Sequence, residues 1–253
     1  MRLITLNLWG GIVYEPLMKF IESHSSDTDI FCFQEMLFGD KSEFTPQDKG
    51  RINLFSEINS RLTDFVPYKN ISTSDHFQHE PIDFPAGQAI FVRKGITVKD
   101  NGGFFCMDKI PWNTMDCGKL TGNFQWIECE LNGDNIFIGN LHGVWQKDTK
   151  KVDTPERFEQ SNKVKNFMDT KKCKKILCGD FNLLNDGQSI SILENGMKNL
   201  IKEYGIISTR SNFYKHPLRF ADYVLVSKDI NINSFKALQD QVSDHLPLLL
   251  NFN

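Results

Sequence analysis

Short apolar runs recur along the whole chain, and their length is the feature that most restricts its fold. Each run holds four to eight residues and is rich in Ile, Val, Leu and Phe, a composition that favours β-strands over buried helices. The runs span residues 3–8, 29–33, 87–92, 124–131, 135–141, 175–178, 222–226 and 246–252. We therefore expect at least eight strands in these 253 residues.

Helical patterns lie between some of the runs. Apolar side chains recur at helical spacing within residues 17–21, 54–65 and 190–193. The clearest helix start is the Asp-Thr-Pro-Glu segment at 153–156, where a capping side chain precedes a proline that the first turn tolerates. Helices mixed among strands predict an α/β architecture, most simply sheets packed face to face with helices outside. No linker or repeat divides the sequence, so we expect a single domain over residues 1–253.

Composition and charge exclude several classes of protein. The chain has 29 Lys and Arg residues against 32 Asp and Glu, a formal net charge of −3, so it lacks a strongly basic coat for nucleic acid. No apolar run approaches the roughly 18 residues of a membrane span, and the N-terminus lacks the apolar stretch of a secretory signal. The six cysteines form no C-x-x-C pair, which favours free thiols in the cytoplasm over disulfides.

Polar residues stand where the apolar runs end, and this pattern repeats along the chain. They are Asn7, Glu35, His142, Asp180, Asn182, Asp222, Asp244 and His245. Taken singly, each has an ordinary alternative, such as a Glu that reaches solvent, a core histidine or an Asp-Asn turn. The strand period of two places Asp180 and Asn182 on one face, whereas the adjacent Asp244 and His245 converge only if a turn presents them.

Taken together, these residues favour a hard divalent cation. Oxygen ligands dominate and no His or Cys cluster has zinc spacing, so Mg²⁺ fits better than Zn²⁺, with Mn²⁺ as a substitute. Such an ion binds phosphate, and the two histidines can act as acid, base or charge-stabilising groups near neutral pH. Ser243 beside Asp244 and His245 also permits a Ser-His-Asp triad, but contiguous residues do not by themselves supply that geometry.

The order of these motifs resembles the endonuclease/exonuclease/phosphatase superfamily, whose fold is similar to that of pancreatic deoxyribonuclease. The motifs are Leu6-Asn7, Gln34-Glu35, Asn140-Leu141-His142, Gly179-Asp180-Phe181-Asn182, Ala221-Asp222-Tyr223 and Ser243-Asp244-His245. A single dipeptide carries no weight, but six motifs in the family's order are very specific. The resemblance implies a four-layer α/β sandwich of two central mixed sheets flanked by helices. It also implies an enzyme that hydrolyses a phosphate ester with Mg²⁺ and direct attack by water.

The resemblance further implies roles for the residues around the metal. Glu35 would be the main Mg²⁺ ligand, with Asn7 and Asp244 close to the ion. Asp180 would orient or deprotonate the attacking water, and Asn182 would hold a phosphate oxygen.

The two histidines also receive roles from the resemblance. Asp222 would bond to His245, which would stabilise the pentacoordinate phosphate or donate a proton to it. His142 would contact another phosphate oxygen or serve as an acid. Some nucleases of the family pair this histidine with a Glu in the strand that corresponds to residues 87–92, whereas this chain has Gln88 there.

Loops decide the substrate within this superfamily, so the loops near the motifs are the candidates for substrate contact. Asn140 and the segment from Trp145 to Lys151, which holds one aromatic residue and three lysines, adjoin His142. Basic and aromatic loop residues suit stacking on unpaired bases, and they suit many other phosphoesters too. Arg210 and Tyr214 belong to a second such loop just before Asp222. An ordinary surface loop is the alternative for this second loop.

We expect a phosphodiester substrate, most simply in DNA or RNA. The alternatives are a phosphatase or phosphodiesterase acting on a small-molecule or lipid phosphoester, and a binding module that has lost catalysis. Because the sequence carries no lipid-insertion helix, polybasic tail or lipidation signal, we expect no stable membrane association. We expect the protein to be a monomer.

Overall fold

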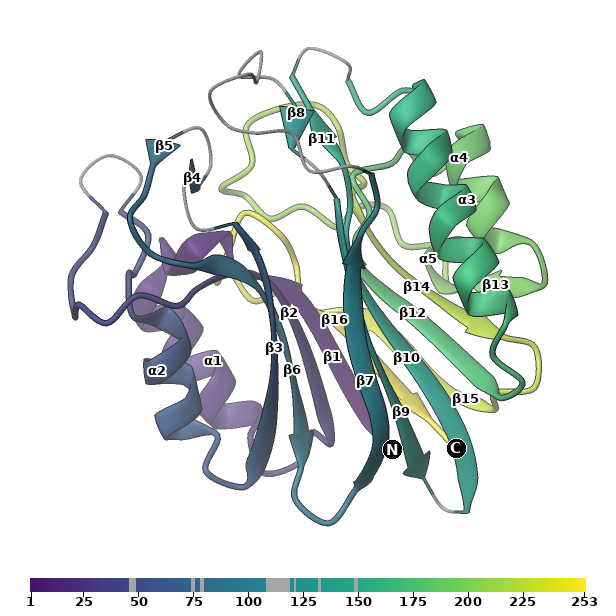
Figure 1. Cartoon of the computed structure of the whole chain (residues 1–253), viewed down its shortest axis with the longest axis horizontal. Helices are drawn as coiled ribbons and strands as arrows, with labels where there is room; N and C mark the ends of the chain where they lie inside the picture. The colour runs from purple at the N-terminus through teal and green to yellow at the C-terminus, as the bar shows by residue number, and fades with distance from the viewer. Residues whose placement is uncertain are drawn as a thin grey trace.

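The computed structural model describes residues 1–45, 49–73, 76–77, 80–107, 119–120, 122–131, 133–147 and 150–253. Two six-stranded sheets lie face to face at its centre, and helices cover the outer side of each sheet (Figure 1). Both sheets are mixed, since each contains one parallel pair among antiparallel ones. The expected α/β sandwich of two packed mixed sheets flanked by helices is therefore confirmed.

The first sheet has the strand order β15-β16-β1-β2-β6-β3. Its strands are β1 (Arg2–Asn7), β2 (Ile30–Leu37), β3 (Phe65–Thr73), β6 (Ala86–Arg93), β15 (Ile232–Ala237) and β16 (Leu248–Phe252). β1 and β2 run parallel, and a 3₁₀ turn, η1 (Trp9–Gly11), follows β1. The helices α1 (Tyr14–His24) and α2 (Leu54–Arg61) cover its outer face (Figure 1).

The second sheet has the strand order β13-β14-β12-β10-β9-β7. Its strands are β7 (Thr97–Phe105), β9 (Asn123–Leu131), β10 (Asp134–His142), β12 (Lys174–Asp180), β13 (Met197–Asn199) and β14 (Asp222–Ser227). β10 and β12 run parallel. Three helices lie outside it, α3 (Pro155–Asp169), α4 (Gln188–Glu194) and α5 (Leu200–Glu203) (Figure 1). Two short strand pairs lie beyond the sheets, β4 (His76–Phe77) with β5 (Glu80–Pro81) and β8 (Lys119–Leu120) with β11 (Trp145–Gln146).

The apolar runs are continuous because the interior strands are covered on both faces. In β1, Leu3 belongs to the core between the sheets, whereas its neighbour Ile4 packs in the core beneath α1 and α2. A strand buried on both faces needs apolar residues at successive positions rather than at every second one. The five described cysteines, Cys32, Cys106, Cys129, Cys173 and Cys178, are free thiols, as expected, while Cys117 lies outside the described residues.

The expected helices are present, with one difference in extent. The side-chain hydroxyl of Thr154 caps α3 by accepting from the Arg157 amide, as the sequence predicted. The helical pattern expected to reach Phe65 is wrong at its end, because α2 stops at Arg61 and Phe65 opens β3. A turn closed by the Phe65 amide and the Leu62 carbonyl reverses the chain there. Among the described residues, no helix is long and apolar enough to cross a membrane.

Candidate active site

Strand register brings the polar strand ends of each sheet together. In the first sheet, Asn7 of β1 lies opposite Gln34 of β2, the residue before Glu35. In the second sheet, His142 pairs with Asp180, and Asp180 pairs in turn with Asp222. Since both parallel pairs end at the same edge of the sandwich, these side chains face one shared site.

The side chain of Asn7 joins the two sheets at this edge. It is fully buried, and its Nδ2 donates to Glu35 Oε1 at 2.9 Å and to Asp180 Oδ2 at 3.1 Å. Its Oδ1 accepts from the Trp9 amide at 2.9 Å, which fixes the orientation of the amide group. Two carboxylates from different sheets therefore converge on a single donor group.

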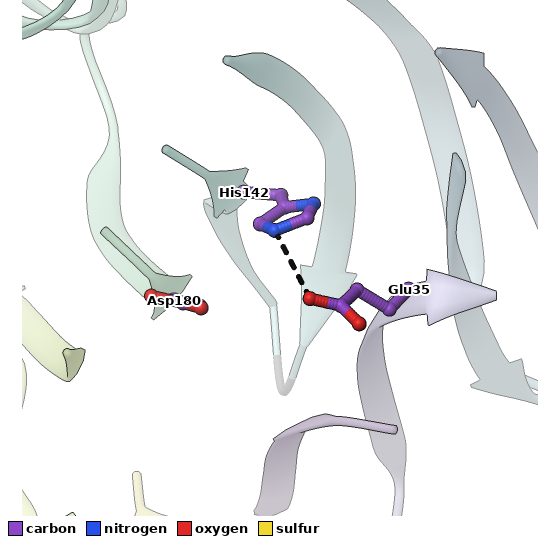
Figure 2. Close-up of side chains that lie close together, drawn as sticks. All are labelled: Glu35, His142 and Asp180. Atoms are coloured by element: carbon purple, nitrogen blue, oxygen red, sulfur yellow. Dashed lines mark ion pairs between the residues drawn. The ribbon is translucent and has the colours of Figure 1, made fainter. Parts of the chain in front are cut away.

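A local irregularity of β2 aims Glu35 into the site. The pairing of β2 with β6 shifts register between Phe33 and Met36, and Glu35 has a φ of 53°. Bulges of this kind redirect a side chain, and a non-glycine residue at positive φ is a strained conformation that functional sites often hold. Figure 2 shows the result: the Glu35 carboxylate points toward His142, whose Nε2 lies 3.6 Å from Glu35 Oε1.

These side chains fit a divalent cation. Glu35, His142 and Asp180 each offer one ligand atom, and the three atoms lie within 4.8 Å of one another (Figure 2). Two carboxylate oxygens with one imidazole nitrogen suit Mg²⁺ or Mn²⁺, and thiolate ligands that would favour zinc are absent from this group. Asp244, also expected near the metal, lies instead beside His245 and Arg210, so its place as a ligand stays a prediction.

Asp180 is held in its ionised form. Burial alone would raise the pKa of this carboxyl, but the positive charges of His245, Lys151 and Arg210 outweigh burial and lower the pKa well below its usual range. Asp180 Oδ1 accepts from the Asn182 amide at 2.9 Å. Asn182 has a φ of 53°, so it lies in a turn past the strand end, and the strand period that predicted a shared face does not apply to it. Its Nδ2 donates to the Gly143 carbonyl.

His245 and Asp222 form a buried pair. His245 Nδ1 lies 2.7 and 2.9 Å from the two carboxylate oxygens of Asp222, and its Nε2 lies 3.6 Å from both Asp180 and Asp244 oxygens. Burial and Arg210 disfavour the charged ring, but Asp222, Asp244 and Asp180 favour it more, so the pKa of His245 is raised above its ordinary value. The residues around Asp244 and His245 form bends rather than a regular strand, which presents both side chains to one site.

Arg210 lies on the same side of the site as His245. Its Nη1 donates to Asp244 Oδ2 at 2.9 Å and contacts His245 Nε2, and its guanidinium stacks on the Tyr214 ring, 4.1 Å from the ring centre. Burial opposes the charge of Arg210, but Asp180, Asp244 and Asp222 raise its pKa. Because a guanidinium only donates, protonation of His245 Nε2 requires Arg210 to turn toward another acceptor.

Lys151 is the residue whose burial the sequence did not reveal. The sequence placed it in the segment from Trp145 to Lys151, a candidate for substrate contact, and in the structure it is only 7% exposed. Its Nζ has no hydrogen-bond partner within the described part of the chain, and the charges that act on it are those of Arg210, Asp180, Asp222 and Asp244. Burial, followed by Arg210, lowers the pKa of Lys151 to about 7 against the pull of the carboxylates.

Asn140 lies below the site rather than on its surface. It is fully buried; its Oδ1 accepts from Gln34 Nε2 at 2.6 Å and its Nδ2 donates to the Phe33 carbonyl at 3.2 Å. Gln88 Nε2 donates to the Asn140 carbonyl at 2.7 Å. Gln88 therefore bonds to the backbone of β10, the strand that ends at His142, rather than to the His142 imidazole. Direct substrate contact by Asn140 stays a prediction, as it does for half-buried Trp145 on β11 and for Tyr214.

Replacing Asn140 with alanine should lower the free energy of unfolding by about 1–3 kcal/mol, because Gln34 Nε2 and the Phe33 carbonyl lose a buried partner. Urea denaturation of the two proteins measures the difference. Asn233→Ala is the matched control, since Asn233 is exposed on β15 and its loss should leave the midpoint unchanged. Equal midpoints for all three proteins would contradict the role given to the Asn140 hydrogen bonds.

Comparisons with known proteins agree with this geometry. The model of the endonuclease/exonuclease/phosphatase family matches residues 4–245. A search of curated proteins finds no match. Solved structures that share the fold include a mannosyl-6-phosphatase of Bacteroides thetaiotaomicron, which is 18% identical with a TM-score of 0.73 over 100% of this chain and 99% of that one.

Two further structures extend the comparison. D. rerio TDP2 in complex with a single-strand DNA product is 14% identical, with a TM-score of 0.70 over 100% of this chain and 98% of that one. A functionally unknown conserved protein from Enterococcus faecalis is 15% identical, with a TM-score of 0.73 over 100% and 99% of the two chains. At these identities the likeness establishes the fold and leaves the substrate open.

Proposed function

Because this chain belongs to the endonuclease/exonuclease/phosphatase family, we propose that it hydrolyses a phosphodiester bond of nucleic acid by direct attack of water. The chain is a metal-dependent hydrolase of the phosphoesterase type. The observation that carries the proposed hydrolysis is the Asn7 amide, which draws Glu35 of one sheet and Asp180 of the other to a single point. Glu35 would hold the metal, with Asn7 and Asp244 close to it.

The Mg²⁺ or Mn²⁺ that these residues would hold would offset the negative charge that builds up on the phosphoryl oxygens. Asp180 then orients the attacking water. Its lowered pKa makes it a weak base, so positioning the water is a better role for it than keeping the water's proton. Asn182, beside Asp180, donates its amide to a phosphate oxygen.

His245 and Asp222 act on the phosphate from the other side. The Asp222 carboxylate holds a proton on His245 Nδ1, so Nε2 is the nitrogen that can serve the substrate once Arg210, which contacts it in the free protein, turns to another acceptor. A protonated Nε2 stabilises the pentacoordinate phosphate, or gives its proton to the ester oxygen as the bond between phosphorus and that oxygen breaks. His142 contacts a further phosphate oxygen or serves as the acid in its place.

Nucleic acid is proposed as the source of the phosphodiester because aromatic and cationic side chains border the site. Trp145 adjoins His142, and Tyr214 stacks with Arg210; aromatic rings with nearby cations suit unpaired bases. A second candidate is a phosphomonoester of a small molecule. It is favoured by the two buried cations Lys151 and Arg210, which would balance the additional charge of a terminal phosphate.

The test assays the purified chain with Mg²⁺ and with EDTA on single- and double-stranded DNA, RNA, a generic phosphodiester and a phosphomonoester. Metal-dependent cleavage of a nucleic acid, abolished in the Glu35→Gln/His245→Ala double variant, would support the nuclease. Turnover of the monoester alone would favour the second candidate. Activity on none of them would contradict the proposal and leave a binding module as the alternative.

We place the protein in the cytoplasm, as a monomer without stable membrane association. The described free thiols, three of which lie in interior strands of the two sheets, suit a reducing compartment.

A further inference from the structure

The ammonium group of Lys151 is an unusual element of the interior. A lysine is almost never fully buried without a partner, because removing its charge from water is costly. Lys151 is 7% exposed, and no described residue accepts a hydrogen bond from its Nζ. Its neighbours in the chain behave differently, since Lys150 is exposed and Val152 is 48% exposed.

The loop around Lys151 is anchored so that this side chain turns inward. Lys150 and Lys151 have φ values of 49° and 60°, a strained conformation for residues other than glycine. Beyond them, the Val152 carbonyl accepts from Arg157 Nη1, and the Asp153 carboxylate accepts from the Gln188 and Ser189 amides at the start of α4. Strain of this kind persists only where the surroundings fix it, and it marks functional sites.

The charges on Lys151 come from the candidate active site. They are those of Arg210, Asp180, Asp222 and Asp244, each of which contacts a ring nitrogen of His245 or lies 3.6 Å from one. Arg210 is already engaged by Asp244 and stacked on Tyr214, whereas the amino group of Lys151 has no hydrogen-bond partner among the described contacts.

We propose that Lys151 is a phosphate-binding residue, whose ammonium group donates to a non-bridging phosphate oxygen on the side of the site occupied by Arg210. The inference rests on the proposed function in that the ligand is a phosphate group, and it adds a specificity-determining cation that the motifs do not contain. A phosphate oxygen supplies the acceptor that the buried ammonium lacks. Bound phosphate would also stabilise the charged form of Lys151, which burial disfavours in the free protein.

Inorganic phosphate is the probe, and its affinity is measured by calorimetry with Mg²⁺ and with EDTA. Loss of a hydrogen bond from a charged group should weaken binding by about 10- to 100-fold in Lys151→Met. Lys151→Arg, which keeps a charged donor, should retain most of the affinity. Lys172→Met is the matched control, because Lys172 is exposed and precedes β12, whose opposite end carries Asp180, and its affinity should equal that of the wild type.

Thermal melting separates this role from a structural one. If Lys151 serves the ligand, Lys151→Met should melt no lower than the wild type without phosphate, and phosphate should no longer stabilise it. If Lys151 only neutralises the neighbouring carboxylates, the variant should melt lower and still bind phosphate, which would overturn the proposal. A wild type that does not bind phosphate would also overturn it.

The same experiments distinguish the failure of this inference from the failure of the proposed function. If phosphate binding depends on Lys151 but the protein cleaves none of the tested esters, the phosphate-binding role of Lys151 is supported and the proposed hydrolysis is wrong. If the wild type hydrolyses an ester and Lys151→Met binds phosphate as tightly as the wild type does, the proposed hydrolysis stands and the role of Lys151 is wrong.

Discussion

Glu35→Gln should lower kcat on the best substrate by roughly 10³-fold, because a metal-held charge stabilises the transition state by several kcal/mol and each 1.36 kcal/mol changes the rate about tenfold. The substitution removes one negative charge from the group formed with His142 and Asp180. A glutamine carbonyl can still accept from Asn7 Nδ2, so the strand irregularity and the fold should persist. Steady-state kinetics over a Mg²⁺ titration measures the effect.

Measuring Mg²⁺ binding tests whether this loss of kcat results from a lost metal ligand. Mg²⁺ should raise the melting temperature of the wild type and have little effect on Glu35→Gln, because a ligand that binds only the folded state stabilises it. Glu15→Gln is the control, since Glu15 is exposed in the first turn of α1. If Glu35→Gln keeps the kcat of the wild type and is stabilised by Mg²⁺ to the same extent, Glu35 is not a metal ligand.

Asp222→Asn should lower kcat by about 10²- to 10⁴-fold, the range expected when an acid–base group is disabled. Both carboxylate oxygens of Asp222 lie within 2.9 Å of His245 Nδ1, so Asp222 fixes the tautomer with the proton on Nδ1 and leaves Nε2 to act on the phosphate. An amide in its place offers only one acceptor and no charge, so the ring loses both its orientation and its stabilised proton. KM should change much less than kcat, because the ground-state phosphate contacts remain.

The pH profile of the same variant gives an independent result. Asp222 is among the carboxylates that raise the pKa of His245, against burial and Arg210. If protonated His245 is the active form, kcat falls as the pH rises through this pKa. Removing the Asp222 charge lowers the pKa, so the alkaline limb of Asp222→Asn should move to lower pH. Asp229→Asn, at an exposed turn after β14, is the control, and an unmoved limb in Asp222→Asn would contradict the pairing.

The sequence identified the interior of each sheet and missed the edges. The eight apolar runs became β1, β2, β6, β9, β10, β12, β14 and β16, and each of these has a strand on both sides. The four edge strands, β3, β7, β13 and β15, went unpredicted. An edge strand needs little apolar surface, and β7 is exposed or half-buried along its whole length, so it lacks the composition by which the interior strands were found.

The candidate site was predictable as far as it depends on strand ends. Asn7, His142, Asp180 and Asp222 close their strands or open them, and the sheets bring them together. What the sequence could not give depends on local irregularities: the positive φ of Glu35 within β2 and the inward turn of Lys151. Both features result from packing between segments far apart in the chain, which strand period and composition cannot predict.

The Asn7 bridge between the sheets has a consequence for how activity arises during folding. Glu35 and Asn7 come from the first sheet, and His142, Asp180 and Asp222 from the second, so either layer formed alone carries only part of the proposed site. A folding intermediate with one finished layer would be chemically inert, however native its backbone. Turnover would begin only when the two layers dock, which makes the enzyme's own reaction a marker for the last step of its assembly.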